Sequence, residues 1–69
     1  MWKYAGELRV GDVWTEPEGR GSRSYRVIEI APGPARSTIT VTGSSVTTGQ
    51  LRTIDLFPVN RVKVRGEPA

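Results

Sequence analysis

Branched side chains constrain the fold of this sequence more than any other feature. Valine, isoleucine and threonine supply 19 of the 69 residues, and branching at Cβ favours strands over helices. Eight glycines and five prolines divide the chain into short segments. The longest uninterrupted apolar run is two residues, too short for a transmembrane helix or the apolar region of a signal peptide. We therefore expect a soluble, cytoplasmic, all-β protein.

Five segments have the composition and period of strands. The clearest is 37–42, in which Ile39 and Val41 share one face and threonines occupy the other, as in a half-buried antiparallel strand. The five predicted strands are 13–16, 24–30, 37–42, 50–57 and 61–65.

The segments between these strands carry turn signals. Residues 17–23 are polar and rich in glycine, which predicts an exposed, mobile loop. Residues 31–36 hold two prolines around a glycine, which predicts a turn. Within 24–30 the apolar phase changes between Val27 and Ile28, which predicts a bulge or a strand buried on both faces.

Five short strands without a helix to cover an open sheet predict a closed barrel. Short connections and the absence of a helix after the third strand favour a five-stranded antiparallel SH3-like barrel over an OB-like one. The sequence predicts one domain over 1–69, with 66–69 as a frayed tail. The predicted core residues are Leu8, Val13, Val27, Ile28, Ile30, Ile39, Val41, Ile54, Leu56, Val62 and Val64.

Two stretches resemble a known fold family. Residues 5–13 read Ala-Gly-Glu-Leu-Arg-Val-Gly-Asp-Val, and residues 25–30 read Tyr-Arg-Val-Ile-Glu-Ile. This pattern resembles the opening of SH3-like barrels such as the N-terminal domain of translation elongation factor P and KOW-type ribosomal modules, with a weaker match at 46–53. The resemblance implies the fold. It does not extend to the modified lysine of the elongation factor, because Lys3 and Lys63 are the only lysines and neither lies in the corresponding stretch.

The whole chain shows a second likeness. A Thr-Gly-x-x-Arg-Thr segment at 48–53 and an Arg-Val-x-Val ending at 61–64 resemble short barrel proteins of actinobacteria and their phages. This resemblance implies a fold and no activity.

The sequence has neither histidine nor cysteine. It therefore lacks disulfides, thiolate metal sites, thiol nucleophiles and the commonest general base. The seven carboxylates show no pairing suited to acid–base chemistry, and Asp12 is predicted to accept backbone N–H groups in a Gly-Asp turn. We expect no enzymatic activity, no cofactor, no metal and no membrane contact.

Basic residues supply the first candidate site. Ten basic and seven acidic residues give a net charge of +3, compatible with a polyanion partner and equally with ordinary solubility. Residues 61–65 carry a row of outward cations that fits a phosphate backbone or protects a strand edge from aggregation. The loop at 17–23 carries a second basic cluster that fits nucleic acid or simple solvation. The predicted nucleic-acid contacts are Arg20, Arg23, Arg52, Arg61, Lys63 and Arg65.

Aromatic residues supply the second candidate site. Trp14 and Tyr25 fall in predicted strands and are expected to pack in the core or at its rim. Trp2 and Tyr4 precede the first predicted strand, where they would form a partner surface if exposed or pack over an open barrel end. Any base-stacking platform must draw on the five aromatic residues.

Two functions fit these features. The first is a non-catalytic module that binds RNA or DNA through its cations and an exposed aromatic ring. The alternative is a protein-interaction or self-assembling accessory factor, for which a phage origin is one hypothesis. Such a factor would bind a host protein or a second copy of itself through Trp2, Tyr4 and free strand edges.

Overall fold

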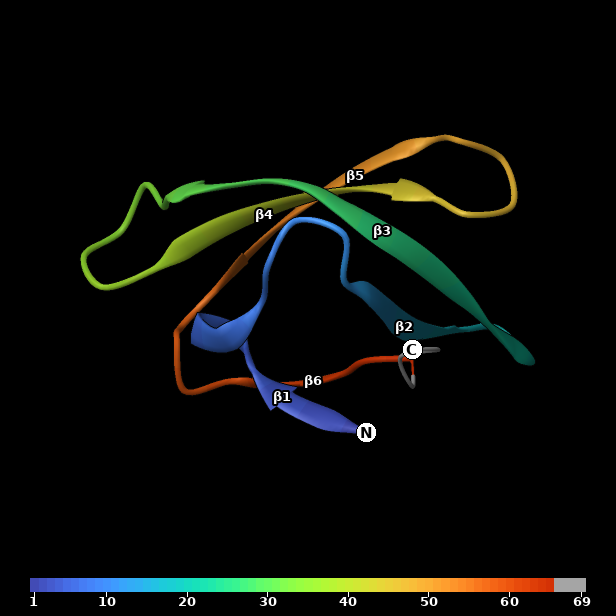
Figure 1. The fold of residues 1–69 in the computed structure, drawn as a ribbon, viewed down its shortest axis with the longest axis horizontal. Helices are drawn as coiled ribbons and strands as arrows, with labels where there is room; N and C mark the ends of the chain where they lie inside the picture. The colour runs from blue at the N-terminus through green and yellow to red at the C-terminus, as the bar shows by residue number, and fades with distance from the viewer. Residues whose placement is uncertain (66–69) are drawn as a thin grey trace.

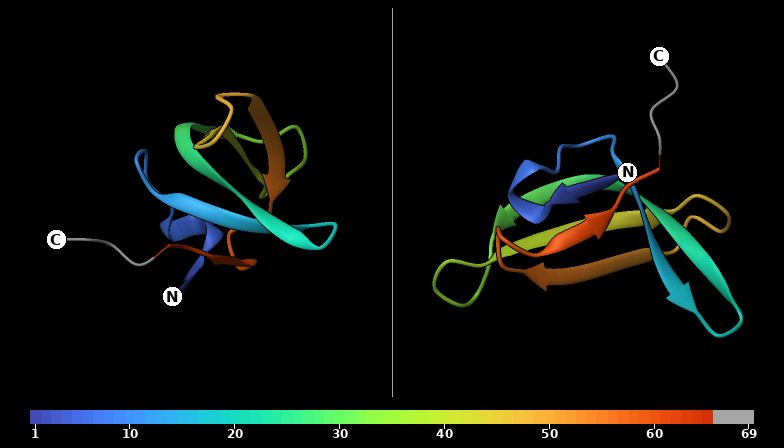
Figure 2. Two further views of the ribbon diagram at one scale, coloured as in Figure 1. Left: turned by 90° about the vertical axis from the view of Figure 1, so that its right-hand side faces the viewer. Right: turned by 90° about the horizontal axis from the view of Figure 1, so that it is seen from below.

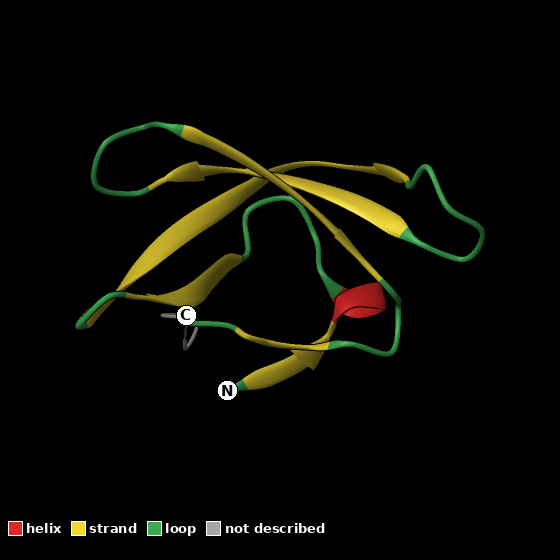
Figure 3. Ribbon diagram, turned by 180° about the vertical axis from the view of Figure 1, so that it is seen from behind, coloured by secondary structure: helices red, strands yellow, loops and turns green. Residues whose placement is uncertain are grey.

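The computed structural model describes residues 1–65 and confirms the all-β class. Within that range the only helix is a single 3-10 turn (Figures 1 and 3), and none is long and apolar enough to cross a membrane. The predicted tail 66–69 lies outside the described residues. The elements are β1 (Trp2–Tyr4), η1 (Ala5–Glu7), β2 (Val13–Glu18), β3 (Gly21–Pro32), β4 (Ile39–Ser45), β5 (Leu51–Leu56) and β6 (Arg61–Lys63).

The strands form two antiparallel sheets. One is a four-stranded meander in the order β2-β3-β4-β5, and the other is a two-stranded ribbon of β1 and β6. The ribbon lies beneath the larger, strongly twisted sheet (Figures 1 and 2). An isolated bridge between Trp14 and Val64 joins the two sheets, and the Arg65 N–H donates to the Val13 carbonyl at 2.8 Å.

The predicted barrel closure is wrong: among residues 1–65 the strand pairing does not run around a full circle. Closure requires each strand to pair along both edges. β6 is three residues long, pairs with β1 along one edge and meets β2 only at the Trp14 bridge. Pro17 also lies in β2 and has no N–H to donate to a neighbouring strand.

The predicted loop at 17–23 is instead the tip of a tight hairpin. β2 extends to Glu18 and β3 begins at Gly21, which pairs with it. The turn is therefore Gly19 and Arg20 alone, with Gly19 at a φ of 58°, a conformation that suits glycine as the first residue of a two-residue hairpin turn. Polar composition predicted exposure correctly but not the short length of the turn.

The ends of other strands also differ from prediction. β3 continues to Pro32, which pairs with Ile39, so the predicted turn at 31–36 shifts to 33–38, closed by the Gly33 N–H donating to the Thr38 carbonyl. Strand β1 was not predicted from the sequence. Its aromatic residues Trp2 and Tyr4 are exposed and the charged Lys3 is partly covered, whereas an ordinary amphipathic strand buries its apolar residues and exposes its charged ones.

The phase change in β3 is a bulge. Val27 pairs with Gly43 and Glu29 with Thr42, which leaves Ile28 as the additional residue. The bulge returns Ile30 to the inner face opposite Val41. Ile28 was predicted in the core, but it is exposed, because alternation turns it outward after the buried Val27 and the bulge leaves it without a partner on β4.

The core is built around two stacked aromatic rings. Trp14 and Tyr25 lie with ring centroids 5.3 Å apart, and both are buried, as the sequence predicted. Trp14 rather than Val13 is the inward residue of β2. Half-buried apolar residues surround the buried cluster: Ile30, Ile39, Ile54 and Leu56 pack against Ala5, Leu8, Trp14, Tyr25, Val27, Val41, Val62 and Val64.

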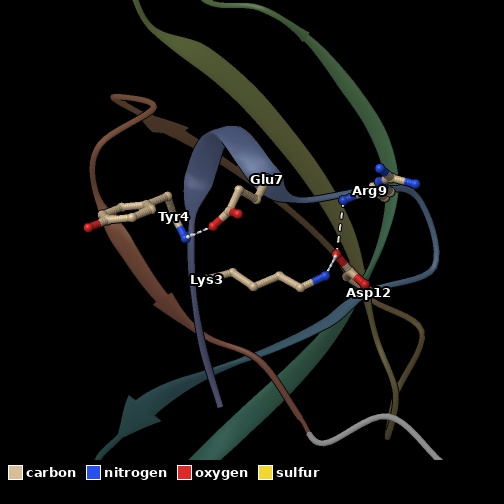
Figure 4. A network of polar contacts seen from close by, with 5 residues as sticks. All are labelled: Lys3, Tyr4, Glu7, Arg9 and Asp12. Atoms are coloured by element: carbon tan, nitrogen blue, oxygen red, sulfur yellow. Dashed lines mark hydrogen bonds and ion pairs between the residues drawn. The ribbon is translucent and has the colours of Figure 1, made fainter. Parts of the chain in front are cut away.

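Asp12 organises the entry to β2, as predicted. Its Oδ2 accepts the Arg9 backbone N–H at 2.9 Å and the Lys3 ammonium at 3.1 Å, and Glu7 accepts the Tyr4 N–H at 3.0 Å (Figure 4). The Lys3 ion pair connects β1 to the Gly-Asp turn. It thereby fixes which face of β1 points outward.

Candidate functional site

The β1–β6 ribbon gathers two aromatic rings and two cations on its outer face. Trp2 pairs directly with Lys63, and Tyr4 pairs directly with Arg61. Directly opposed residues of an antiparallel ladder project their side chains from the same face. All four are exposed, with Trp2 at 60% and Tyr4 at 52%. We call these four residues the ribbon face.

The opposite face of the ribbon anchors it to the protein. Val62 is buried and lies opposite Lys3 in the ladder. The Lys3 ammonium forms an ion pair with Asp12. The backbone N–H groups of Ala5 and Gly6 donate to the carbonyls of Asn60 and Pro58 at 2.7 and 3.0 Å. These contacts hold the ribbon in register, so the four outer side chains are presented from a fixed backbone.

The remaining predicted cations lie elsewhere. Arg20 is exposed at the tip of the β2–β3 hairpin, and Arg23 pairs across the ladder with Glu16. The Arg65 guanidinium donates to the Ser24 hydroxyl at 3.4 Å. Of the six predicted contacts, only Arg61 and Lys63 share a face with the exposed aromatic rings.

Arg52 is held by an acidic partner. Its guanidinium donates two hydrogen bonds to the Glu16 carboxylate, from Nε at 2.6 Å and from Nη2 at 3.1 Å. These bonds lower the pKa of Glu16 from its ordinary value of 4.5, against the opposing effect of partial burial. The pair joins β2 to β5, the two outer strands of the larger sheet, and neutralises the charge of Arg52.

A groove of about 540 Å³ opens where the barrel fails to close. It is lined by residues of β2, the start of β3, β5 and β6 together with Trp2 of the ribbon face. Its covered lining is mostly apolar: Trp14 and Val62 are buried, Ile54 and Leu56 are half-buried, and the half-buried Thr15 and Glu16 are polar. The exposed lining includes Arg61 and Lys63, so the groove adjoins the ribbon face.

A buried hydrogen-bond donor lines this groove without a partner. Trp14 is 1% exposed, and its indole Nε1 has no hydrogen-bond partner in the part of the chain that the structure describes. The indole contributes to lowering the pKa of the neighbouring Glu16 carboxyl, although the N–H does not complete a hydrogen bond to it. An unsatisfied buried donor costs about 1–3 kcal/mol.

The sequence identified the four ribbon-face residues but assigned them to two separate hypotheses. Their convergence depends on pairing between residues 2–4 and 61–63, which no local pattern specifies. The alternating triplets Trp-Lys-Tyr and Arg-Val-Lys were the available signal, because each places its outer residues on one face. The groove was missed altogether, since the predicted barrel was closed.

Comparison with known proteins gives no assignment. No protein-family model matches the sequence, and no curated protein shows significant similarity to it. Within residues 1–65, no three His, Cys, Asp or Glu side chains gather closely enough to hold a metal ion. The ribbon face and the groove beside it are the surface features that bear on function.

Proposed function

We propose that this protein is a non-catalytic module that binds single-stranded nucleic acid through the ribbon face. The observation that carries the proposal is the register of β1 and β6, which sets Trp2 beside Lys63 and Tyr4 beside Arg61. Single-stranded ligands are bound by this combination, because bases stack on aromatic rings and phosphates are attracted to adjacent cations.

The energetics favour a partner of this kind. Two large aromatic side chains more than half exposed leave apolar surface in water that a stacked base would cover. Stacking contributes about 1–3 kcal/mol per base. The two cations add an electrostatic contribution through counterion release. Together these terms support modest, salt-dependent affinity with little dependence on sequence.

Fluorescence anisotropy with a labelled single-stranded oligonucleotide at several salt concentrations tests this proposal. The double variant R61A/K63A should bind more weakly and reduce the magnitude of the slope of log K against log salt by about 1.4, because each phosphate contact to a single strand contributes about 0.7. W2A and Y4A should weaken binding while leaving that slope close to the wild-type value.

Arg36 provides the matched control. It is an exposed arginine in the β3–β4 connection, so R36A removes a positive charge without touching the ribbon face. Equal losses in R36A and R61A would show attraction by net charge alone and contradict a specific face. Affinity no tighter than about millimolar at low salt, weaker than ordinary non-specific binding, would also end the proposal.

The same variants distinguish a protein-binding function. If the oligonucleotide fails to bind and W2A abolishes a self-association detected by sedimentation velocity, the ribbon face is a contact between protein chains. Aromatic residues are enriched in such interfaces, so this outcome has a clear physical basis.

We also propose that the architecture is an opened relative of SH3-like barrels. Support comes from the strand order: β2 to β5 form a meander, and β6 returns to meet β2 at the Trp14–Val64 bridge. The resemblance of residues 5–13 and 25–30 to the elongation factor P and KOW-type domains points in the same direction. In this relation β1 is an additional strand that widens the ribbon.

A further inference from the structure

We propose that the groove between β2, β5 and β6 accommodates one unstacked nucleobase of the single strand bound at the ribbon face. This inference rests on the proposed function and assigns the groove a distinct role within it. The ribbon face would hold the backbone and neighbouring bases, whereas the groove would take a single base out of the stack.

The lining of the groove suits a flat, largely apolar ring. Trp14, Ile54, Leu56 and Val62 supply the covered surface, and the exposed Trp2 ring stands at its border. A volume of about 540 Å³ lies within the range of sites that bind small organic groups, which are mostly apolar with few polar groups.

The charges in the groove give a bound nucleotide one orientation. Arg61 and Lys63 lie on the β6 side and attract a phosphate. On the β2 side the lining residues Trp14, Thr15, Glu16 and Pro17 include no cation, and Glu16 is paired with Arg52, so that side has no lining cation to attract a phosphate. The phosphate therefore belongs beside β6 and the base beside β2.

On the base side of the groove, the buried indole N–H of Trp14 lies near the Glu16 carboxylate and has no hydrogen-bond partner among residues 1–65. The Watson–Crick edge of every nucleobase places a hydrogen-bond acceptor next to a donor. The Trp14 N–H and the Glu16 carboxylate offer the complementary pair. A sugar phosphate without a base offers no ring to fill the apolar surface.

Nuclear magnetic resonance of the ¹⁵N-labelled protein tests the inference directly, because the chain has two tryptophans and so two indole N–H signals. The probes are a single-stranded deoxyadenosine decamer and an abasic decamer with the same backbone. We expect the decamer to shift the Trp14 and Trp2 indole signals. The abasic strand should leave the Trp14 signal in place.

Each other outcome has a definite meaning. If the decamer binds and shifts the Trp2 signal but leaves Trp14 unchanged, the groove inference fails and the proposed function stands. If both strands shift Trp14 equally, the signal reports a general rearrangement and the groove inference fails. If the decamer shifts neither signal and does not bind, both proposals fail.

Filling the groove gives an independent test that leaves Trp14 in place. Ser22 is exposed and lines the groove, so S22W introduces a ring at its opening. We expect decamer affinity to fall at least about fivefold, the loss of one base stack, and the Trp14 shift to vanish. The control A35W adds the same ring in the exposed β3–β4 connection. Undiminished affinity in folded S22W would overturn the inference.

Discussion

Gly43 shows how a single residue determines the packing of this core. It lies in β4 opposite Val27, directly against the Trp14 ring. A Cβ at this position would lie well inside 3.0 Å of two Trp14 ring atoms and 3.0 Å from the Tyr25 Cβ. The glycine thus leaves the space in which the stacked pair of aromatic rings sits.

The variant G43A should therefore be strongly destabilising. Overpacking a well-packed core costs about 1–3 kcal/mol, and in a domain of this size each kcal/mol lowers Tm by roughly 4–8 °C. Thermal unfolding followed by near-ultraviolet circular dichroism measures the change. G21A is the matched control, because its Cβ would meet nothing within 4 Å. Equal Tm values for the two variants would show that the Trp14 ring moves aside at little cost.

At the level of single residues the sequence predicted the inner face well, except where the ladder is irregular. Val41, Val62 and Val64 are buried as predicted, because period-two alternation fixes the face of a regular strand. Ile28 was misplaced, since hydrophobicity alone does not reveal which residue of a bulge is unpaired. Gly43 lies just beyond the predicted strand 37–42, and its contact with Trp14 depends on tertiary packing.

Between elements, the ion pair of Glu16 and Arg52 takes the place of missing strand pairing. It links β2 and β5, the two strands that remain at the edges of the larger sheet. The contact has bidentate geometry, which is the favourable case among ion pairs near the surface. Even so, partly exposed pairs contribute only about 0.2–1 kcal/mol.

This pair predicts a pH-dependent stability. The pKa of Glu16 is lower in the folded protein than its ordinary value of 4.5, so its stabilising contribution is complete above that value and is lost as the pH falls through the folded-state pKa. E16Q should lower the free energy of unfolding at pH 7 by about 0.5–1 kcal/mol. Once the pH falls below the folded-state pKa and the wild-type carboxyl is protonated, the two proteins should converge.

Urea denaturation at a series of pH values measures this difference. E29Q is the control, because Glu29 is an exposed carboxylate on β3. A constant gap between wild type and E16Q from pH 7 down to pH 2 would mean that the ionised carboxylate is not responsible.

On the scale of the whole molecule, local patterns predicted the meander but not the arrangement of the ribbon. β2 to β5 are joined by turns with clear glycine and proline signals, so each pairs with its neighbour in sequence. The β1–β6 pairing joins residues distant in the chain, and nothing in either triplet identifies the other as its partner. For the same reason the sequence could not show that its aromatic and basic candidates form one surface.

The two sheets should differ in local stability. A two-stranded ribbon is marginal by itself, and this one depends on three paired positions and contacts to the 57–60 turn. We expect backbone amides of β1 and β6 to exchange with deuterium faster than those of Val27 and Val41 in the larger sheet, because sparse packing lowers the free energy of local opening. Uniform protection across both sheets, measured by hydrogen exchange, would contradict this expectation.

The pairing of residues 2–4 with 61–63 also sets an order of events during synthesis. The hairpins of the larger sheet can close as soon as each emerges from the ribosome, whereas loop closure between distant strands comes late. Trp2 and Tyr4 are translated first but acquire their neighbours Lys63 and Arg61 last. A folding chain would thus have a largely formed larger sheet before the four residues of the ribbon face come together.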